Sequence, residues 1–313
     1  MKRTTYFMWS LIFVLIGVPL TVMLFANTTV FELTEWRGIL EQWGLVHPGL
    51  QVTFSTIQTR PGEFFVIRVD PLGANETVAI SAPFITEEPR VFPHESGAVT
   101  LIPLDYRTTP GMYVMEAAVM KNGGIIHKLE QNITVDSRDF AVQKMNVSPE
   151  LLSRRNDDLW AEDRIFTSQA RSQPNPKPLW EGSFLQPVEG RITTQFGQIR
   201  YINDQESGRH SGLDIAAPEG TPIVASNQGI VVLARFLHVT GNTIILDHGL
   251  NLFTSYAHLD QINVQLGQQV AKGQIMGTVG NTGFSTGSHL HWAVSIGSVF
   301  VDPDWVMAAE PLL

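Results

Sequence analysis

The first hydrophobic feature of the chain is an uncharged, mostly apolar run from Tyr6 to Phe25, which follows Lys2 and Arg3. As a helix rising about 1.5 Å per residue, this run spans about 30 Å, the thickness of a bilayer's hydrocarbon core. Positive charge before the run and acidic sequence after it predict a cytoplasmic N-terminus and an exported remainder. The run ends in a poor match to a signal-peptidase site, because a bulky leucine stands at the first small position. We therefore predict an uncleaved signal anchor over residues 1–26, with a cleaved leader as the alternative, and a juxtamembrane segment over residues 27–50.

From residue 51 to residue 137, short runs rich in β-branched and aromatic residues alternate with turns that contain Gly, Pro and Asn. Asn122-Gly123-Gly124 is typical of a hairpin turn between two such runs. Short strands at this spacing predict a small β-sandwich that resembles an immunoglobulin-like module. No cluster of catalytic residue types falls in these runs, so we interpret residues 51–137 as a spacer domain.

Residues 138–179 combine a predicted helix with a proline-rich linker. Ser148-Pro149 is a typical helix start, since serine caps the N-terminus and proline fits the first helical position. The charged stretch that follows carries apolar residues in a loosely amphipathic pattern, which favours one helix to about Ala170. The segment Ser172–Pro178, with three prolines, then ends the helix and forms a semi-rigid spacer.

From residue 180 to residue 313 the composition changes to many glycines, strand-like runs and six of the chain's 9 histidines. Asp247-His-Gly-Leu-Asn251 lies between two strand-like runs and predicts a hairpin loop. The pattern predicts an antiparallel β domain with hardly any helix. The predicted fold class is therefore mainly β: a transmembrane helix, a small sandwich, a helical linker and an antiparallel β-sheet domain.

Composition narrows the classes of function. The 313 residues include 21 Lys and Arg against 30 Asp and Glu, for a formal net charge of −9. A nucleic-acid binder shows a basic patch, so the acidic balance predicts no nucleic-acid partner. There is no cysteine, which excludes thiol nucleophiles, Cys-ligated zinc, iron–sulfur clusters and disulfide frameworks.

Two short elements of the C-terminal region carry residue types that bind metals. His289 and His291 are two apart on a strand-like run, so both imidazoles point to one face and can converge on one ion. His210 and Asp214 are four apart, and Gly212 between them lets the chain bend so that both can face that ion. Two imidazoles and one carboxylate make a plausible catalytic zinc set that leaves a position for water.

Further motifs surround these residues in a fixed order. They are Phe196–Arg200, His210–Pro222, Asp247–Gly249, Tyr256–Leu259, Gly267–Gln274 and Gly280–His291. In this order and spacing they resemble the lysostaphin/LytM family of zinc metallopeptidases, which cut peptidoglycan cross-bridges or stem peptides. The resemblance covers most of residues 180–313.

The resemblance implies a role for each of five residues. His210, Asp214 and His291 are expected to bind Zn²⁺, and His258 and His289 to be the catalytic histidines beside the metal. A histidine has an ordinary pKa near 6.5 and can exchange protons at neutral pH, which agrees with this division. One imidazole would assist the attacking water, while the other would hydrogen-bond the oxyanion or protonate the leaving amine, and the sequence leaves open which does which.

Two positions depart from the family's pattern. Ser288 stands where proline is common, and Ala293 stands where a glutamate often follows the histidine pair. Since Ala293 shares a strand face with His291, a hydrogen bond that orients the ligand is expected to be missing.

Other polar residues have weaker expected roles. Tyr256 is two residues from His258, so on a regular strand it would share that face and aid the oxyanion. His248, in a predicted turn, is expected to be structural. Asn203, Asp204 and Glu206, in the loop after Gly197, give a further hypothesis: one of them occupies the open position of the metal in a latent form.

We therefore expect a bacterial, zinc-dependent endopeptidase that cleaves peptidoglycan stem peptides or cross-bridges during cell-wall remodelling. Its substrate would be an extended peptide containing Gly or D-Ala. The alternative is a weak or inactive LytM-type regulator that binds the wall and activates partner hydrolases, since some family members have lost their metal site. The chain would cross the cell membrane once, with its C-terminal domains in the wall or periplasm. The sequence does not identify which proteins of the divisome or of wall synthesis would be its partners.

Overall fold

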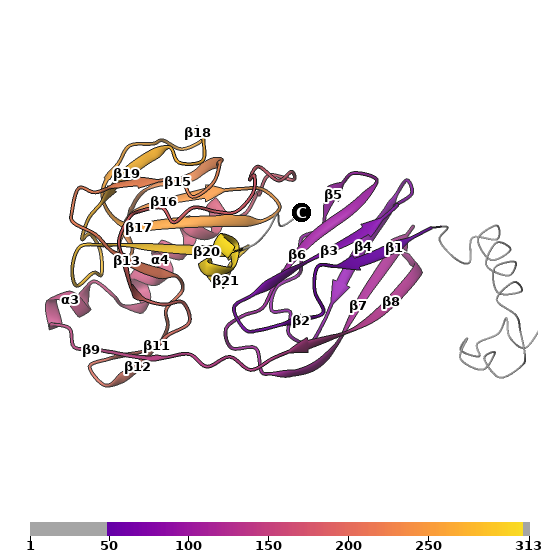
Figure 1. Ribbon diagram of the computed structural model, residues 1–313, viewed down its shortest axis with the longest axis horizontal. Coiled ribbons are helices and arrows are strands. Elements are labelled where there is room, and N and C mark those ends of the chain that lie inside the picture. The colour runs from indigo at the N-terminus through magenta and orange to yellow at the C-terminus, as the bar shows by residue number, and fades with distance from the viewer. Residues whose placement is uncertain (1–48, 309–313) are drawn as a thin grey trace, which may run out of the picture. The chain divides into compact units, whose positions relative to one another are not determined.

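The computed structural model describes residues 49–308 (Figure 1). The signal anchor predicted over residues 1–26 lies outside the described residues, as does nearly all of the juxtamembrane segment. Within residues 49–308, no helix is both long enough and apolar enough to cross a membrane. Strands far outnumber helices among the described elements, so the mainly β prediction is confirmed.

Two four-stranded sheets pack together in the first part of the described chain. Their strand orders are β1-β3-β6-β5 and β2-β8-β7-β4. The bounds are β1 Gln51–Phe54, β2 Gln58–Thr59, β3 Phe64–Asp70, β4 Glu76–Ser81, β5 Phe92–His94, β6 Gly97–Pro103, β7 Gly111–Lys121 and β8 Gly124–Val135. Alternate residues of β7, Met115, Ala117 and Val119, are buried and share one core with Ile67 and Ile102 of the other sheet. Two packed sheets agree with the predicted sandwich, while its immunoglobulin-like character stays a prediction.

The segment that follows contains one strand and two helices: β9 Val142–Met145, α3 Pro149–Ser153 and α4 Asp157–Ala170. The prediction of one continuous helix after Ser148 is wrong. Ser148 caps α3, but the side chain of Asn156 accepts a hydrogen bond from the backbone N–H of Leu159 and caps a second helix there. The parallel pairing of β9 with β11 (Ile199–Ile202) was not predicted.

A ten-stranded antiparallel sheet forms the C-terminal part. Its main path is β10-β13-β20-β17-β16-β15-β18, with β14, β19 and β21 paired beside it. The bounds are β10 Arg191–Thr194, β13 Leu213–Ala216, β14 Pro222–Val224, β15 Gly229–Leu237, β16 Gly241–Asp247, β17 Leu252–Ile262, β18 Gln269–Val270, β19 Ile275–Val279, β20 His289–Ile296 and β21 Val299–Val301. A smaller sheet joins β12 (Gln205–Arg209), β11 (Ile199–Ile202) and β9, and α5 (Pro303–Ala308) follows β21.

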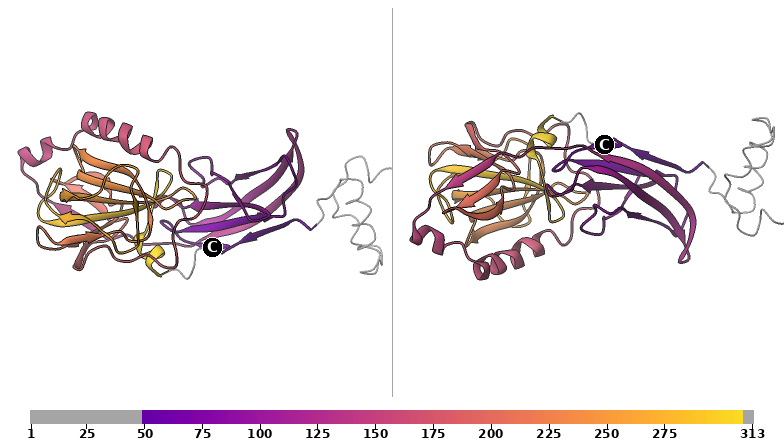
Figure 2. Two further views of the ribbon diagram at one scale, coloured as in Figure 1. Left: turned by 90° about the horizontal axis from the view of Figure 1, so that it is seen from above. Right: turned by 90° about the horizontal axis from the view of Figure 1, so that it is seen from below.

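Helix α4 lies along the large sheet (Figure 2). Phe166 and Ala170 pack against an apolar cluster on β15, β16 and β17. Asp163 of α4 is buried and accepts hydrogen bonds from the backbone N–H groups of His238 and Val239, both at 2.8 Å. These contacts hold α4, which connects the sandwich to the large sheet, against the large sheet and beside the candidate site.

Candidate metal centre and active site

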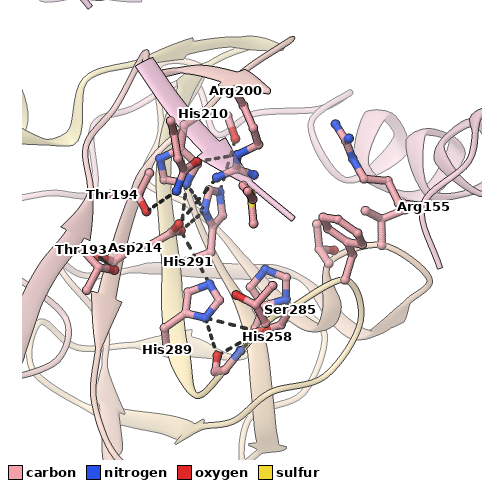
Figure 3. A pocket seen from close by; sticks show the side chains of 18 of the residues that line it. Arg155, Thr193, Thr194, Arg200, His210, Asp214, His258, Ser285, His289 and His291 are labelled. Atoms are coloured by element: carbon pink, nitrogen blue, oxygen red, sulfur yellow. Dashed lines mark hydrogen bonds and ion pairs between the residues drawn. The ribbon is translucent and has the colours of Figure 1, made fainter. Parts of the chain in front are cut away.

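The five candidate residues come from four neighbouring elements. Asp214 on β13 and His291 on β20 are direct partners across the antiparallel ladder, and His289 begins β20. His210 directly follows β12, and His258 lies on β17. All five line one cavity of about 450 Å³ (Figure 3). The structure thus brings together the five residues expected to bind the metal or to act as catalytic histidines, from positions up to 81 residues apart.

Three donor atoms of the expected metal ligands lie very close to one another. His210 Nε2 is 2.8 Å from Asp214 Oδ1 and 3.0 Å from His291 Nδ1, and His291 Nδ1 is 2.9 Å from the same Asp214 oxygen. His210 Nδ1 donates to the carbonyl oxygen of Gln195 at 2.9 Å, which leaves a lone pair on Nε2 of the neutral ring. Because a carboxylate oxygen cannot donate either, the contact between His210 and Asp214 requires a proton or a cation.

The donor set fits a divalent metal ion. Ligands about 2.1 Å from a tetrahedral zinc lie about 3.4 Å from one another, so the three atoms need to separate only slightly. Burial raises the pKa of the Asp214 carboxyl, but the imidazoles of His210 and His291 in contact with it outweigh burial and hold that pKa well below its ordinary value. Burial lowers the pKa of His291 to about 4. Both groups are therefore deprotonated at neutral pH, the form that binds metals.

The other two histidines lie side by side at the same cavity. The ring centroids of His258 and His289 are 4.8 Å apart. Nδ1 of His258 donates to the carbonyl oxygen of Thr282 at 2.8 Å, and Nδ1 of His289 donates to that of Gly287 at 2.7 Å. Each neutral ring therefore carries its lone pair on Nε2, and Nε2 of His289 is 3.7 Å from Asp214 Oδ1. Burial, followed by the charge of neighbouring histidines, lowers the pKa of His258 to about 3.

The expected role of Tyr256 is wrong, because β17 is not regular there. His258 has a left-handed φ of 62°, and the register with β16 shifts between Asn242 and Ile244. This bulge interrupts the alternation of faces, so Tyr256 and His258 do not point the same way. The Tyr256 hydroxyl is buried and contacts the backbone N–H and the hydroxyl of Ser226, at 2.9 Å and 2.6 Å.

His248 is structural, as expected. It is fully buried, with Nδ1 2.7 Å from the carbonyl oxygen of Gln228 and Nε2 2.7 Å from the Thr254 hydroxyl. It does not line the cavity that holds the five candidate residues.

The structure does not place the residues of the hypothesised self-inhibiting loop at the metal site. Asn203 and Asp204 form the turn between β11 and β12, and Glu206 follows on β12. All three are exposed and none lines the cavity. The Asn203 side chain instead hydrogen-bonds the backbone N–H and carbonyl groups of Val147.

Ser211 takes a place that the sequence analysis missed. Ala293 is buried and offers His291 no hydrogen bond, as expected for that departure from the family pattern. His291 Nε2 lies instead 3.3 Å from the Ser211 hydroxyl, which can fix the orientation of the ring. Ser211 stands directly after His210, so its position in the motif was the available signal. Ser288, the other departure, lines the cavity.

The sequence analysis also missed a set of arginines. Arg155, Arg200 and Arg209 line the same cavity, on elements that precede the histidine motifs. Arg200 belongs to the motif Phe196–Arg200, but only the fold places it beside Asp214, with Nη2 3.7 Å from Oδ2. Arg155 lies in the turn between α3 and α4, across the cavity from the cluster of His210, Asp214 and His291 (Figure 3).

Comparison with known proteins gives a family for the C-terminal region. The family model described as Peptidase family M23 matches residues 208–303. An uncharacterized metalloprotease of Buchnera aphidicola subsp. Baizongia pistaciae is 35% identical over 124 residues, which is 39% of this chain and 33% of that protein. The peptidoglycan DD-endopeptidase ShyA of Vibrio cholerae is 44% identical over 113 residues, which is 35% of this chain and 26% of ShyA. The matched regions thus span a third or less of these relatives.

A solved structure is similar over more of the chain. It is a crystal structure from Pseudomonas aeruginosa assigned to peptidase M23, with 26% sequence identity and a TM-score of 0.55. The likeness covers 87% of this chain and 99% of that one.

Proposed function

The C-terminal region of this chain is a peptidase M23 domain, and from this premise we propose that the protein is a zinc-dependent endopeptidase that hydrolyses peptide bonds in peptidoglycan. The observation that carries the proposal is the convergence of His210, Asp214, His258, His289 and His291 on one cavity. The name of the relative ShyA supports peptidoglycan as the substrate.

Three of these residues would hold the metal: His210, Asp214 and His291. A bound zinc ion supplies Lewis acidity toward the scissile carbonyl and lowers the pKa of water toward neutrality. The chain prepares the ligands itself. The Gln195 carbonyl keeps His210 in the tautomer whose Nε2 is free, and the ladder between β13 and β20 holds Asp214 opposite His291.

The remaining two histidines would move protons. His258 and His289 both donate Nδ1–H to carbonyl oxygens, which fixes each ring and leaves Nε2 free to accept a proton. One imidazole takes the proton of the attacking water on Nε2. The other hydrogen-bonds the developing oxyanion or protonates the leaving amine only after it has itself been protonated on Nε2. His258 is buried and the His289 side chain is 16% exposed, and this low exposure to water strengthens these interactions.

Metal analysis combined with digestion of purified peptidoglycan tests the proposal. We expect about one zinc ion per chain and the release of soluble peptides. The His291→Ala variant should lose both the zinc and the peptide release, and a chelator should abolish the peptide release of the wild type. Zinc restored after chelation should restore the release. A chain that binds no zinc and releases no peptide would instead be a wall-binding regulator of other hydrolases.

We propose further that residues 1–26 anchor the chain in the cell membrane of a bacterium and that the C-terminal domains face the wall or periplasm. The apolar run Tyr6–Phe25 after Lys2 and Arg3 supports this placement. Protease added to spheroplasts should digest the C-terminal domains, and a chain protected until the membrane is lysed would contradict the placement. Proteins of wall synthesis or division are the partner class we would look for by cross-linking.

A further inference from the structure

The cavity at the candidate site is positively charged although the chain is acidic. Three guanidinium groups line it, those of Arg155, Arg200 and Arg209, and together we call them the arginine wall. Among the described lining residues, Asp214 is the one carboxylate. The chain as a whole has a formal net charge of −9. Positive charge is therefore concentrated at this cavity, although the chain as a whole is negatively charged.

The partners of the arginine wall are mostly neutral. Arg155 donates to the hydroxyl and the carbonyl oxygen of Ser207, the latter at 3.1 Å. Arg209 donates to the carbonyl oxygen of Gly197 and stacks over the ring of Phe140. Within residues 49–308, no carboxylate lies within ion-pair distance of either Arg155 or Arg209.

Arg200 has one acidic neighbour, which it shares with the expected metal. Its Nε donates to the Gln143 side chain at 2.8 Å, and its Nη2 is 3.7 Å from Asp214 Oδ2. Because Asp214 also contacts two histidines, its charge is already engaged. Arg200 is 18% exposed and cannot rely on water alone to compensate its charge.

Arg155 and Arg200 are close enough to repel each other. Burial lowers the pKa of Arg155, and the positive charge of Arg200 lowers it further. The charge of Asp157 acts in the opposite direction, but within residues 49–308 no carboxylate lies within ion-pair distance of Arg155, and Arg200 has only the shared Asp214. A bound anion would relieve this unfavourable pair of half-buried cations. In Figure 3, Arg200 lies beside His210 and Arg155 lies across the cavity from it.

We infer that the arginine wall binds a free carboxylate of the substrate peptide close to the scissile bond. The inference rests on the proposed peptidase function and narrows its substrate. Stem peptides of peptidoglycan carry free carboxylates, whereas an all-glycine cross-bridge carries none along its length. A planar guanidinium matches a carboxylate with two parallel hydrogen bonds. The site is therefore built for a stem-peptide substrate.

Synthetic cross-linked stem peptides test the inference. Each free carboxylate is replaced in turn by a carboxamide, and kcat and KM are measured for the zinc-loaded full chain. For one position we expect the carboxylate to be preferred by about tenfold in kcat/KM, mainly through KM, as for the loss of a hydrogen bond to a charged group. Arg155→Gln, which removes the positive charge, should lose most of that preference, and Arg155→Lys, which keeps the charge, should keep part of it.

Arg164→Gln is the matched control, since Arg164 is exposed on α4 and does not line the cavity. It should behave as wild type. If no peptide is cleaved, the proposed function fails. If wild type cleaves every carboxylate and carboxamide pair equally, the inference fails and the proposed function stands. If Arg155→Gln slows both members of a pair by the same factor at unchanged melting temperature, Arg155 has only a structural role and the inference is overturned.

Discussion

The buried imidazole of His248 makes the stability of the chain depend on pH. The ring packs edge-on to Phe184 with centroids 5.0 Å apart, and Nδ1 donates to the Gln228 carbonyl oxygen at 2.7 Å. Burial lowers its pKa from the ordinary 6.5 to about 4. In the unfolded chain the ring titrates near 6.5, so between these values the unfolded state binds more protons than the folded state. The free energy of unfolding must therefore fall as the pH falls through this window.

The size of the loss follows from the two pKa values. The contribution of His248 is fully present above about pH 6.5 and declines by about 1.4 kcal/mol for each unit that the pH drops toward 4. Between pH 7 and pH 5 the linkage relation gives a loss of about 2 kcal/mol from this one residue.

Urea unfolding of the metal-free chain, followed by tryptophan fluorescence at pH 7 and pH 5, measures this loss. The comparison variant is His248→Asn, whose amide can still donate to the Gln228 carbonyl but does not titrate. The free energy of unfolding of wild type should fall by about 2 kcal/mol more than that of the variant, because all other titrating groups are common to both. Equal losses in the two proteins would refute the assignment of His248 as a buried neutral histidine.

Three further substitutions separate chemistry from structure. His258→Gln should keep its bound metal, measured by mass spectrometry, while kcat on peptidoglycan fragments falls by about 10²–10⁴; loss of the metal would make His258 a ligand instead. Tyr256→Phe should leave kcat unchanged and lower the free energy of unfolding by about 1–3 kcal/mol, because the buried groups that contact the hydroxyl lose their hydrogen-bond partner. A large drop in kcat while the metal site is fully occupied would instead give Tyr256 a catalytic role. Gly212→Ala places a Cβ 2.2 Å from a backbone oxygen of β20, so it should destabilise by more than about 2 kcal/mol and weaken metal binding. Gly287→Ala, whose Cβ meets nothing within 4 Å, is its control, and equal melting temperatures for the two would contradict the clash.

The candidate metal ligands could be singled out in the sequence because their geometry is local. His289 and His291 share one face by strand alternation alone, and Gly212 lets His210 and Asp214 face one ion. The ladder of β13 and β20 then brings Asp214 opposite His291. Spacing within short motifs made these residues candidates, and the resemblance to a family divided them into expected metal ligands and expected catalytic histidines.

The misses have a common physical origin. Tyr256 was placed on the wrong face because a bulge at His258 interrupts the alternation, and a bulge has no strong mark in the sequence. The break between α3 and α4 depends on the cap at Asn156, which was overlooked within a loosely amphipathic stretch. Arg155 could not be assigned at all, because it reaches the cavity only through tertiary packing.

The strand and helices between the sandwich and the large sheet have one more consequence. Gln143, Met145, Arg155 and Trp160 line the cavity, and all four lie before residue 180. A recombinant fragment that begins after the proline-rich segment would keep every histidine of the site but would lack the residues that form one side of the cavity. Substrate preferences measured on such a fragment would describe a cavity that lacks one of its sides. Inhibitor screens should therefore use the longer chain.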